Sequence, residues 1–258
     1  MTIKQLVILG STSSIAKALL PTIEVDPHHI FTFDRANSSL LANTWIPRIN
    51  QFQINWGGSA EIERNILDKL SDCISGPVLL INFMGMFGEI QKIENLDIED
   101  MLSTFSGNML PFLLAAKIAI SIPRGSSVVS FSGAGVGGDN LDDSSFGYLA
   151  AKSSIGLLTE VIDHQLSPHG NRFGLVSPGA FPSRMQEAVA EDSTGLIPES
   201  RKIRAQEVMK SSPSTEKLTK LIHFLAANPD QLGGRTWSAN FDELRTQDGN
   251  FGKLRRVY

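Results

Sequence analysis

The sequence predicts an α/β fold in which a doubly wound parallel sheet carries helices on both faces. Apolar runs of strand length alternate with segments of helical periodicity along most of the chain. Within these runs the apolar residues are consecutive rather than alternate, as strands that are covered on both faces require. The first run ends in a glycine and small residues and leads directly into a helical segment. Together these three observations favour a sheet sandwiched between two layers of helices.

The predicted strands are short apolar segments bounded by glycine, proline or polar residues. In chain order they cover residues 6–10, 29–34, 49–55, 77–85, 126–133, 171–179 and 233–241. Helical periodicity joins them over residues 14–23, 36–43, 60–72, 98–120, 148–162 and 216–228. The remaining long connection, residues 186–212, is polar and weakly periodic, and we expect it to form an irregular lid over a substrate site.

The composition is that of an ordinary soluble globular protein. The chain has 258 residues, of which 41% are hydrophobic, and a net charge of −4. This length fits one large domain, and we expect a single domain over residues 1–258. No basic face indicates nucleic acid, and the amino-terminal apolar segment is too short for a membrane span or a signal peptide. We therefore expect a cytoplasmic protein with neither a nucleic-acid nor a membrane partner.

The turn after the first strand has the features of a diphosphate-binding site. Small side chains there let a diphosphate approach the backbone amides at the start of the following helix. The glycine fingerprint of such turns is incomplete, because Ser14 and Ala16 occupy the positions of two of its three glycines. A tight turn without a ligand is the alternative reading of this segment. The candidate cofactor-binding residues of the turn are Gly10, Ser11, Thr12, Ser13, Ser14 and Ile15.

The ends of the second and third strands bear on the choice of dinucleotide. Asp34 lies near the distance along the chain at which an acidic residue accepts hydrogen bonds from an adenosine ribose. A carboxylate there would repel a 2′-phosphate and so favours NAD. Arg35 indicates the opposite, because its guanidinium could hold the 2′-phosphate of NADP. Asn55 ends the third strand and is a candidate for contact with the adenine.

Tyr148 is one of only two tyrosines in the chain, and Lys152 lies four positions later. Residues at this spacing share a helix face, so the phenol and the ammonium can point into one site. The pair begins the helix after the fifth strand, and that strand ends in Ser132. Strand alternation places Ser130 on the same side as Ser132, and we prefer Ser132 because it lies beyond the strand end.

Five segments, in this order, resemble motifs of the short-chain dehydrogenase/reductase family, and the resemblance covers essentially the whole chain. They read "GSTSSIA", "INFMG", "FSGNMLPF", "SFSGAG" with "YLAAK", and "VSPGAFPSRM". In "INFMG", Phe83 and Met84 depart from the family's Asn-Asn-Ala-Gly motif. Besides the amino-terminal turn, the matching residues are Asn82, Gly85, Asn108, Ser132, Tyr148, Lys152, Pro178, Gly179 and Ser183. The carboxyl-terminal segments are also similar to a branch associated with bacterial surface-polysaccharide biosynthesis.

The resemblance implies a Rossmann-like fold and an NAD(P)-dependent oxidoreductase that interconverts a carbonyl and an alcohol by hydride transfer. It implies that Tyr148 is the acid and base and that Ser132 binds the substrate oxygen. Lys152 would hold the nicotinamide ribose and, together with the positive ring of oxidised nicotinamide, would lower the pKa of the phenol. Asn108 would position a relay water. These four are the predicted catalytic residues. Among the predicted cofactor-binding residues are Asn82, Gly85, Pro178, Gly179 and Ser183, with NAD as cofactor, NADP as the alternative, and no metal.

The expected substrate is a small carbonyl or alcohol compound, with a keto-sugar or its nucleotide-linked form favoured by the branch likeness and by the polar lid. The lid residues that could bind such a substrate are Glu187, Asp192, Ser193, Arg201, Lys202 and Arg204. Two very apolar helices, 98–120 and 148–162, predict a homodimer or homotetramer, as in the family. The alternatives are a non-catalytic dinucleotide-binding sensor and a nucleotide-sugar epimerase or dehydratase, which would need a larger carboxyl-terminal domain.

Overall fold

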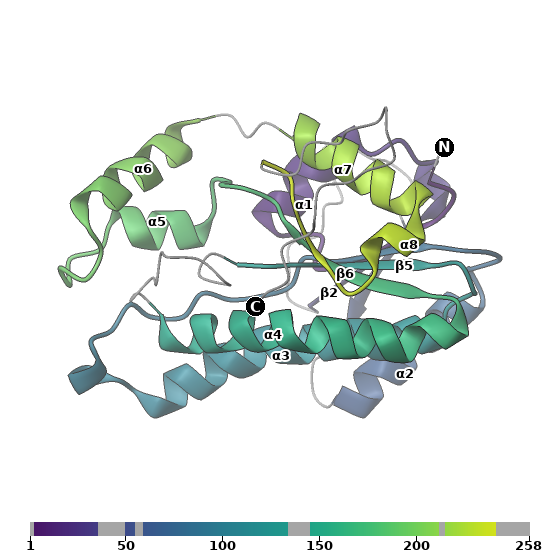
Figure 1. Cartoon of the computed structure of the whole chain (residues 1–258), viewed down its shortest axis with the longest axis horizontal. Coiled ribbons are helices and arrows are strands. Elements are labelled where there is room, and N and C mark those ends of the chain that lie inside the picture. The colour runs from purple at the N-terminus through teal and green to yellow at the C-terminus, as the bar shows by residue number, and fades with distance from the viewer. Residues whose placement is uncertain (1–2, 36–49, 55–58, 134–144, 212–214, 241–258) are drawn as a thin grey trace.

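A computed structural model of the chain describes residues 3–35, 50–54, 59–133, 145–211 and 215–240. Within these residues seven strands form one sheet in the order β3-β2-β1-β4-β5-β6-β7 (Figure 1). Every neighbouring pair is parallel. The strands are β1 Leu6–Leu9, β2 Ile30–Arg35, β3 Asn50–Ile54, β4 Leu79–Asn82, β5 Ser127–Phe131, β6 Arg172–Ser177 and β7 Thr236–Ser238. Each overlaps its predicted segment, so the predicted parallel sheet is confirmed.

Helices cover both faces of this sheet, which confirms the doubly wound architecture (Figure 1). Helices α2, α3 and α4 pack on one face, and α1, α7 and α8 pack on the other. Their bounds are α1 Ser14–Leu19, α2 Ser59–Ser71, α3 Ile98–Ser121, α4 Phe146–Leu166, α5 Arg184–Ala190, α6 Glu199–Lys210, α7 Glu216–Ala227 and α8 Pro229–Leu232. The helix predicted over residues 36–43 lies outside the described residues.

The strand side chains alternate between two separate apolar cores. In β1, Val7 and Leu9 enter the core under α2, α3 and α4, whereas Leu6 and Ile8 enter the core under α1 and α7. All four side chains are buried. This is why the strand is apolar at consecutive positions, since neither of its faces meets water.

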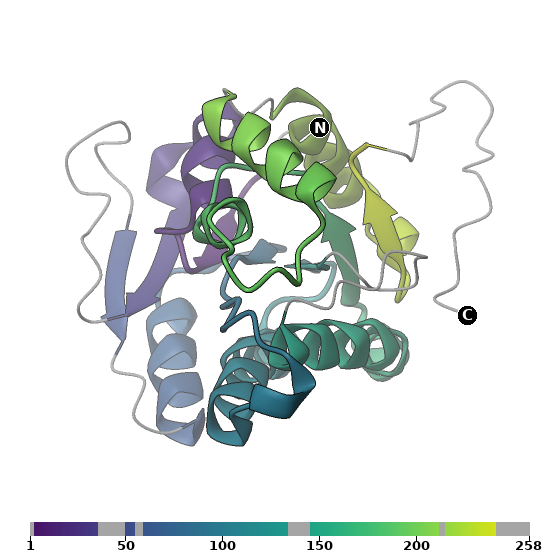
Figure 2. The same cartoon turned by 90° about the vertical axis from the view of Figure 1, so that its left-hand side faces the viewer.

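The predicted lid, residues 186–212, is not irregular as expected, because it contains most of α5 and the whole of α6. They lie at the end of the molecule where α3 and α4 begin (Figures 1 and 2). Their buried residues form a small cluster of Val189, Ile197 and Ala205, separate from the two main cores. Helix α6 itself buries only Ala205 among its twelve residues, which explains why its sequence carries so little apolar periodicity.

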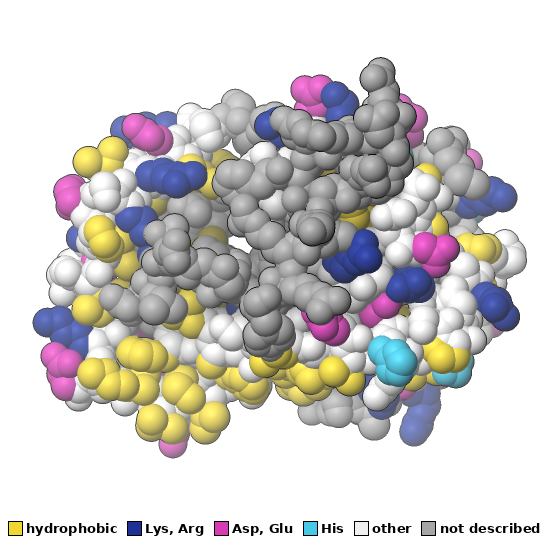
Figure 3. All heavy atoms as spheres, in the orientation of Figure 1, with side chains coloured by type: hydrophobic (Ala, Val, Ile, Leu, Met, Phe, Trp, Pro, Cys, Tyr) yellow, Lys and Arg dark blue, Asp and Glu magenta, His cyan; other side chains and the backbone are white. Residues whose placement is uncertain are grey.

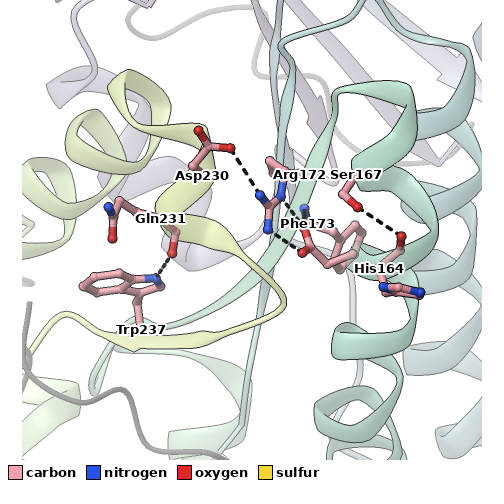
Figure 4. A network of polar contacts seen from close by, with 8 residues as sticks. His164, Ser167, Arg172, Phe173, Asp230, Gln231 and Trp237 are labelled. Atoms are coloured by element: carbon pink, nitrogen blue, oxygen red, sulfur yellow. Dashed lines mark hydrogen bonds and ion pairs between the residues drawn. The ribbon is translucent and has the colours of Figure 1, made fainter.

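An ion-pair network anchors α4 and α8 to the start of β6 (Figure 4). Arg172 donates to both carboxylate oxygens of Asp163, from Nε at 3.0 Å and from Nη2 at 2.7 Å. Its Nη1 also donates to Asp230 at 3.2 Å. Nearby, the indole N–H of Trp237 donates to the carbonyl of Gln231 at 3.1 Å. This network lies at the amino end of β6, away from the strand ends that build the candidate site.

Helix α3 combines a buried face with an exposed apolar face. Within the described part of the chain, it is the one helix long and apolar enough to cross a membrane by composition, and 56% of its apolar window is buried inside the fold. That burial is what a core helix of a folded domain shows. Its remaining apolar side chains, together with some of α4, gather along one edge of the molecule (Figure 3). The exposed residues are Leu102, Leu110, Leu113, Ile120, Leu157 and Val161.

Candidate active site

The candidate site lies at the carboxyl edge of the sheet, where β1, β4 and β5 end side by side. The strand order reverses between β1 and β4, and doubly wound sheets bind ligands in the crevice at this point. Gly10 follows β1 with φ of +83°, a left-handed conformation that favours glycine. A Cβ on Gly10 would lie 2.7 Å from Cγ of Met84 in the loop after β4. Because Gly10 has no Cβ, the turn after β1 can pack closely against the loop after β4.

Asp34 closes the turn between β1 and α1. Its side chain is buried and accepts two hydrogen bonds, from Ser11 Oγ at 2.5 Å and from the backbone N–H of Thr12 at 3.3 Å. These bonds place a carboxylate at the end of β2, next to the predicted diphosphate turn. Arg35 ends the same strand, but its side chain lies outside the described part of the structure, as does the whole of Asn55.

The start of α1 is built from short polar residues. The Ser13 hydroxyl accepts from the backbone N–H of Ala16 at 3.1 Å and caps the helix. Ser14 is exposed and Ile15 is half-buried. The turn therefore brings backbone amides to a helix amino terminus, where an anion is stabilised. Contact between these residues and a diphosphate stays a prediction.

Two neighbouring serines that strand alternation could not separate have different surroundings. Ser130 is buried in β5 and accepts from Nδ2 of Asn82 at 3.2 Å. The Oδ1 of Asn82 in turn accepts from the backbone N–H of Met84 at 3.1 Å, which ties the end of β4 to its following loop. Ser132 lies beyond the end of β5 and is only half-buried. Of the two serines, Ser132 is therefore the more accessible, and its contact with a substrate stays a prediction.

Tyr148 and Lys152 lie one turn apart in α4 and converge on the end of β5. Lys152 is 7% exposed, and its Nζ donates to the carbonyl of Phe131 at 3.0 Å. The same Nζ lies 5.6 Å from the centroid of the Tyr148 ring. The Tyr148 hydroxyl rests against Gly133, because a Cβ there would overlap the hydroxyl and lie 2.8 Å from Cζ. The phenol is thus held next to the backbone of the strand end that carries Ser132.

Asn108 approaches the same place from α3. Its Nδ2 donates to the carbonyls of Met86 at 2.7 Å and Thr104 at 2.8 Å. Its Oδ1 is buried and has no hydrogen-bond partner within the described part of the chain. A Cβ on Gly85 would lie 2.8 Å from this Oδ1 and 3.9 Å from Nζ of Lys152. The side chains of Asn108 and Lys152 therefore both face the small space beside Gly85.

Burial governs the ionisation of the central pair. It raises the pKa of Tyr148 to about 12 and lowers the pKa of Lys152 to about 8. The predicted lowering of the pKa of the phenol depends on the positive ring of a bound oxidised nicotinamide as well as on Lys152, and it stays a prediction. The ammonium lies over the ring and donates to Phe131, so it does not offset the loss of water around the hydroxyl.

The segment after β6 leads from the site into the lid. Pro178 and Gly179 are half-buried, and Gly179 has φ of +86°. The side chain of Asn240 packs against Gly179, where a Cβ would lie 2.6 Å from Nδ2 of Asn240. The Ser183 hydroxyl accepts from the backbone N–H of Gln186 at 3.4 Å and caps α5. Their contact with a cofactor stays a prediction.

Two of the charged lid residues are engaged with each other rather than with a substrate site. Lys202 Nζ donates to the carbonyl of Asp192 at 2.6 Å and lies 3.3 Å from its carboxylate Oδ2. The Asp192 carboxylate also accepts from the backbone N–H of Thr194 at 3.1 Å and from its hydroxyl at 2.6 Å. These contacts brace the loop between α5 and α6. The other predicted lid residues that are exposed are Glu187, Ser193 and Arg204.

Two residues beside the phenol were not assigned a role from the sequence. The ring of Phe87 meets that of Tyr148 edge to face, with 5.4 Å between centroids and an interplanar angle of 66°. Phe87 belongs to an apolar run at a strand end, and core packing explains that run as well as a role in the site does. Gly133 follows Ser132 directly, and this adjacency was the only sequence signal for it.

The sequence comparisons find one partial relative. No protein-family model matches the sequence. A protein of Schizosaccharomyces pombe described as an uncharacterized oxidoreductase is 35% identical over 104 residues, which make up 39% of this chain and 35% of that protein. The chain thus matches about a third of the length of this curated relative.

The fold is shared with solved structures of dehydrogenases. The ligand-free aldohexose dehydrogenase of Thermoplasma acidophilum has a TM-score of 0.69 at 17% identity, over 97% of this chain and 98% of that one. Sorbitol-6-phosphate 2-dehydrogenase of Erwinia amylovora has a TM-score of 0.72 at 16% identity, over 90% and 96%. A short-chain dehydrogenase of Burkholderia cenocepacia in complex with NADP has a TM-score of 0.69 at 18% identity, over 92% and 98%. The likeness establishes a Rossmann-like fold for this chain.

Proposed function

We propose that this chain is an NAD(P)-dependent oxidoreductase of the short-chain dehydrogenase/reductase family, which interconverts a carbonyl and an alcohol by hydride transfer. The observation that carries the proposal is the position of the Tyr148 hydroxyl against Gly133, the residue after Ser132, with Lys152 over the ring. The shared fold and the partial identity to a protein described as an oxidoreductase support it.

Each residue of the site has a role that its surroundings support. Ser132 would donate a hydrogen bond to the substrate oxygen, and Tyr148 would give that oxygen its proton as the alcohol forms. When bound, the nicotinamide supplies or accepts the hydride. The described residues contain no group of three or more His, Cys, Asp or Glu side chains suited to a metal, and the mechanism needs none.

Asn108 and Lys152 would return the proton from solvent to Tyr148. A water beside Gly85 could accept from Lys152 and donate to Oδ1 of Asn108, which otherwise has no partner among the described residues. Since burial brings the pKa of Lys152 to about 8, this side chain can lose and regain a proton near neutral pH. Its ammonium form would also hold the nicotinamide ribose.

We infer a preference for NAD(H) from Asp34. The carboxylate is buried at the end of β2 and fixed by Ser11 and Thr12, so its negative charge remains beside the expected ribose position. Such a charge disfavours a 2′-phosphate. Tighter binding of NADPH than of NADH in a fluorescence titration would refute this reasoning and indicate Arg35 as the governing residue.

For the substrate we propose a polar carbonyl compound, with a keto-sugar or nucleotide-linked keto-sugar as the leading class. The structural neighbours named as aldohexose and sorbitol-6-phosphate dehydrogenases support a sugar-like substrate. The sequence likeness to reductases of surface-polysaccharide biosynthesis is a second, separate support. The engaged pair Asp192 and Lys202 contributes nothing to this argument, which leaves Glu187, Ser193 and Arg204 as the exposed members of the predicted substrate-binding set.

The apolar surface of α3 and α4 supports a homodimer or homotetramer. Leu110 and Leu157 are 53% and 50% exposed, and with their neighbours they form an apolar patch that a second copy of the chain would cover (Figure 3). Sedimentation of the wild type should therefore give an oligomer. A Leu110→Glu variant should dissociate, whereas Ile203→Glu on α6 should not.

The function is tested by incubating the purified protein with NADH or NADPH and a panel of carbonyl compounds that includes keto-sugar nucleotides. We expect Tyr148→Phe to reduce turnover by at least a hundredfold while cofactor affinity changes little, because it removes one proton and almost no packing. The matched control is Tyr258→Phe, which changes the other tyrosine of the chain. Turnover of Tyr148→Phe within a fewfold of wild type would exclude the assignment. Cofactor binding without turnover of any carbonyl would favour the sensor instead.

A further inference from the structure

Phe87 connects the Tyr148 ring to the lid. On one side its ring meets Tyr148 edge to face, with centroids 5.4 Å apart. On the other side it packs against the buried apolar cluster of the lid, formed by Val189, Ile197 and Ala205. One side chain thus touches both the proposed acid and base and the predicted lid.

The backbone of Phe87 is fixed where it makes these contacts. Its carbonyl accepts from the hydroxyl of Ser145 at 2.5 Å, three residues before Tyr148 in the chain. Ser145 is itself buried. The following residue, Gly88, has φ of +76° and lies against Thr104 of α3, where a Cβ would be 2.8 Å from Cγ2 of the threonine. The loop after β4 therefore has little freedom to move away from the start of α4.

We propose that Phe87 is a positioning residue that couples the packing of α5 and α6 to the surroundings of the Tyr148 phenol. The ring closes one side of Tyr148, and the lid cluster holds the ring in place. Loss of either the ring or the cluster would admit water to the phenol. This inference rests on the proposed function for its catalytic consequence alone, because the surroundings of the phenol can be measured without turnover.

The expected direction follows from the groups that face Tyr148. Among the described residues, Phe87 and Gly133 lie against Tyr148 from other elements and are uncharged, and from α4 itself Lys152 lies over the ring. Burial is the cause that raises the pKa of Tyr148 to about 12. Partial hydration in a Phe87 variant should therefore bring its pKa down toward the value of about 10 of a free phenol.

The test is an NMR titration of the holoprotein and of the free chain, labelled with ¹³C at the tyrosine Cζ. The chain has two tyrosines, so a Tyr258→Phe background leaves Tyr148 as the only signal. We expect Phe87→Leu and the unbranched Phe87→Met, which is of similar volume, to lower the titration midpoint by on the order of one pH unit. Val189→Ala, which removes lid packing without touching Tyr148, should shift it in the same direction by less.

The matched control is Phe224→Leu. Phe224 makes an edge-to-face pair with Trp237 on the other face of the sheet, at 5.8 Å and 62°, so this variant loses a contact of similar geometry. It should leave the midpoint of Tyr148 unchanged. An equal shift in this control, or no shift in both Phe87 variants, would overturn the proposal. A shift with Phe87→Met but none with Val189→Ala would overturn the coupling to the lid.

Kinetics distinguish failure of this inference from failure of the proposed function. If the wild type turns over no carbonyl, the proposed function fails and the titration still decides the role of Phe87. If the wild type is active, Phe87→Met should lower kcat about tenfold with less change in KM for the cofactor, because the phenol loses the ring that holds it in position, a loss that exceeds the gain from a lower pKa. Circular dichroism recorded along the titration shows whether each variant remains folded at each pH.

Discussion

Replacing Lys152 with methionine should make the protein more stable at neutral pH although it removes a site residue. The side chain is 7% exposed, and burial lowers its pKa from the ordinary 10.5 to about 8. Because one pKa unit corresponds to about 1.4 kcal/mol, keeping this group charged at pH 7 costs the folded state about 3 kcal/mol. The hydrogen bond from Nζ to Phe131 returns about 1 kcal/mol. We therefore expect Lys152→Met to raise the free energy of unfolding by about 2 kcal/mol.

The pH dependence of this difference identifies its cause. The pKa of Lys152 is depressed in the folded protein, so between about pH 8 and 10.5 the unfolded chain binds more protons than the folded one. The stability of the wild type therefore rises with pH through this window, relative to the variant. Because the pKa of Tyr148 is raised in the folded protein, the free energy of unfolding falls as the pH rises above 10. This happens in both proteins, so the effect of Tyr148 cancels in the comparison.

Denaturant titrations of both proteins at pH 7 and pH 10 measure the two differences. The advantage of Lys152→Met should be about 2 kcal/mol at pH 7 and should nearly vanish at pH 10. Lys17→Met, on the exposed side of α1, is the control and should change stability by no more than about 0.5 kcal/mol. A destabilised variant at pH 7, or a difference independent of pH, would refute the assignment of a buried ammonium.

Two further substitutions separate the site from its scaffold. In Gly133→Ala the new Cβ must displace the Tyr148 ring, which should lower kcat by on the order of a hundredfold in steady-state assays; unchanged kcat would show that the ring has room to move. In Asp163→Ala the guanidinium of Arg172 loses its buried partner, which should cost about 2–4 kcal/mol in denaturant titrations without changing KM; a change in KM would contradict a purely structural role.

The sheet could be predicted because strands that are buried on both faces consist mainly of consecutive apolar residues. All four buried residues of β1 are apolar, and in β4 three buried apolar residues precede the buried Asn82, so each strand appears as a consecutive apolar run. Helices α5 and α6 could not be predicted in the same way. Their apolar cluster has three fully buried members from separate parts of the segment, and the rest of their surface is polar. A helix that buries so little leaves almost no periodic signal.

The sequence predicts which residues of the candidate site share a place in the fold, but not their hydrogen-bond partners. Helical spacing puts Tyr148 and Lys152 on one face, and Ser132 follows a strand, whereas their catalytic roles come from the family resemblance. By contrast, the bond between Ser11 and Asp34 joins residues 23 positions apart and depends on how β1 pairs with β2. The raised pKa of Tyr148 depends on burial, which sequence spacing does not report. Tertiary packing determines both.

Two glycines without side chains let α3, α4 and the loop after β4 approach one another closely. Gly107 of α3 receives the side chain of Met86, and a Cβ there would lie 2.7 Å from its Cγ. Gly147 of α4 would bring a Cβ to 2.5 Å from the carbonyl of Met101 in α3. Each glycine thus removes the atoms that would separate α3, α4 and the loop after β4. Close approach of these three backbones is what places Asn108 within reach of Lys152. Substituting either helix glycine should therefore displace Asn108 and Lys152 relative to each other, and a fall in kcat for Gly147→Ala in steady-state assays would measure it.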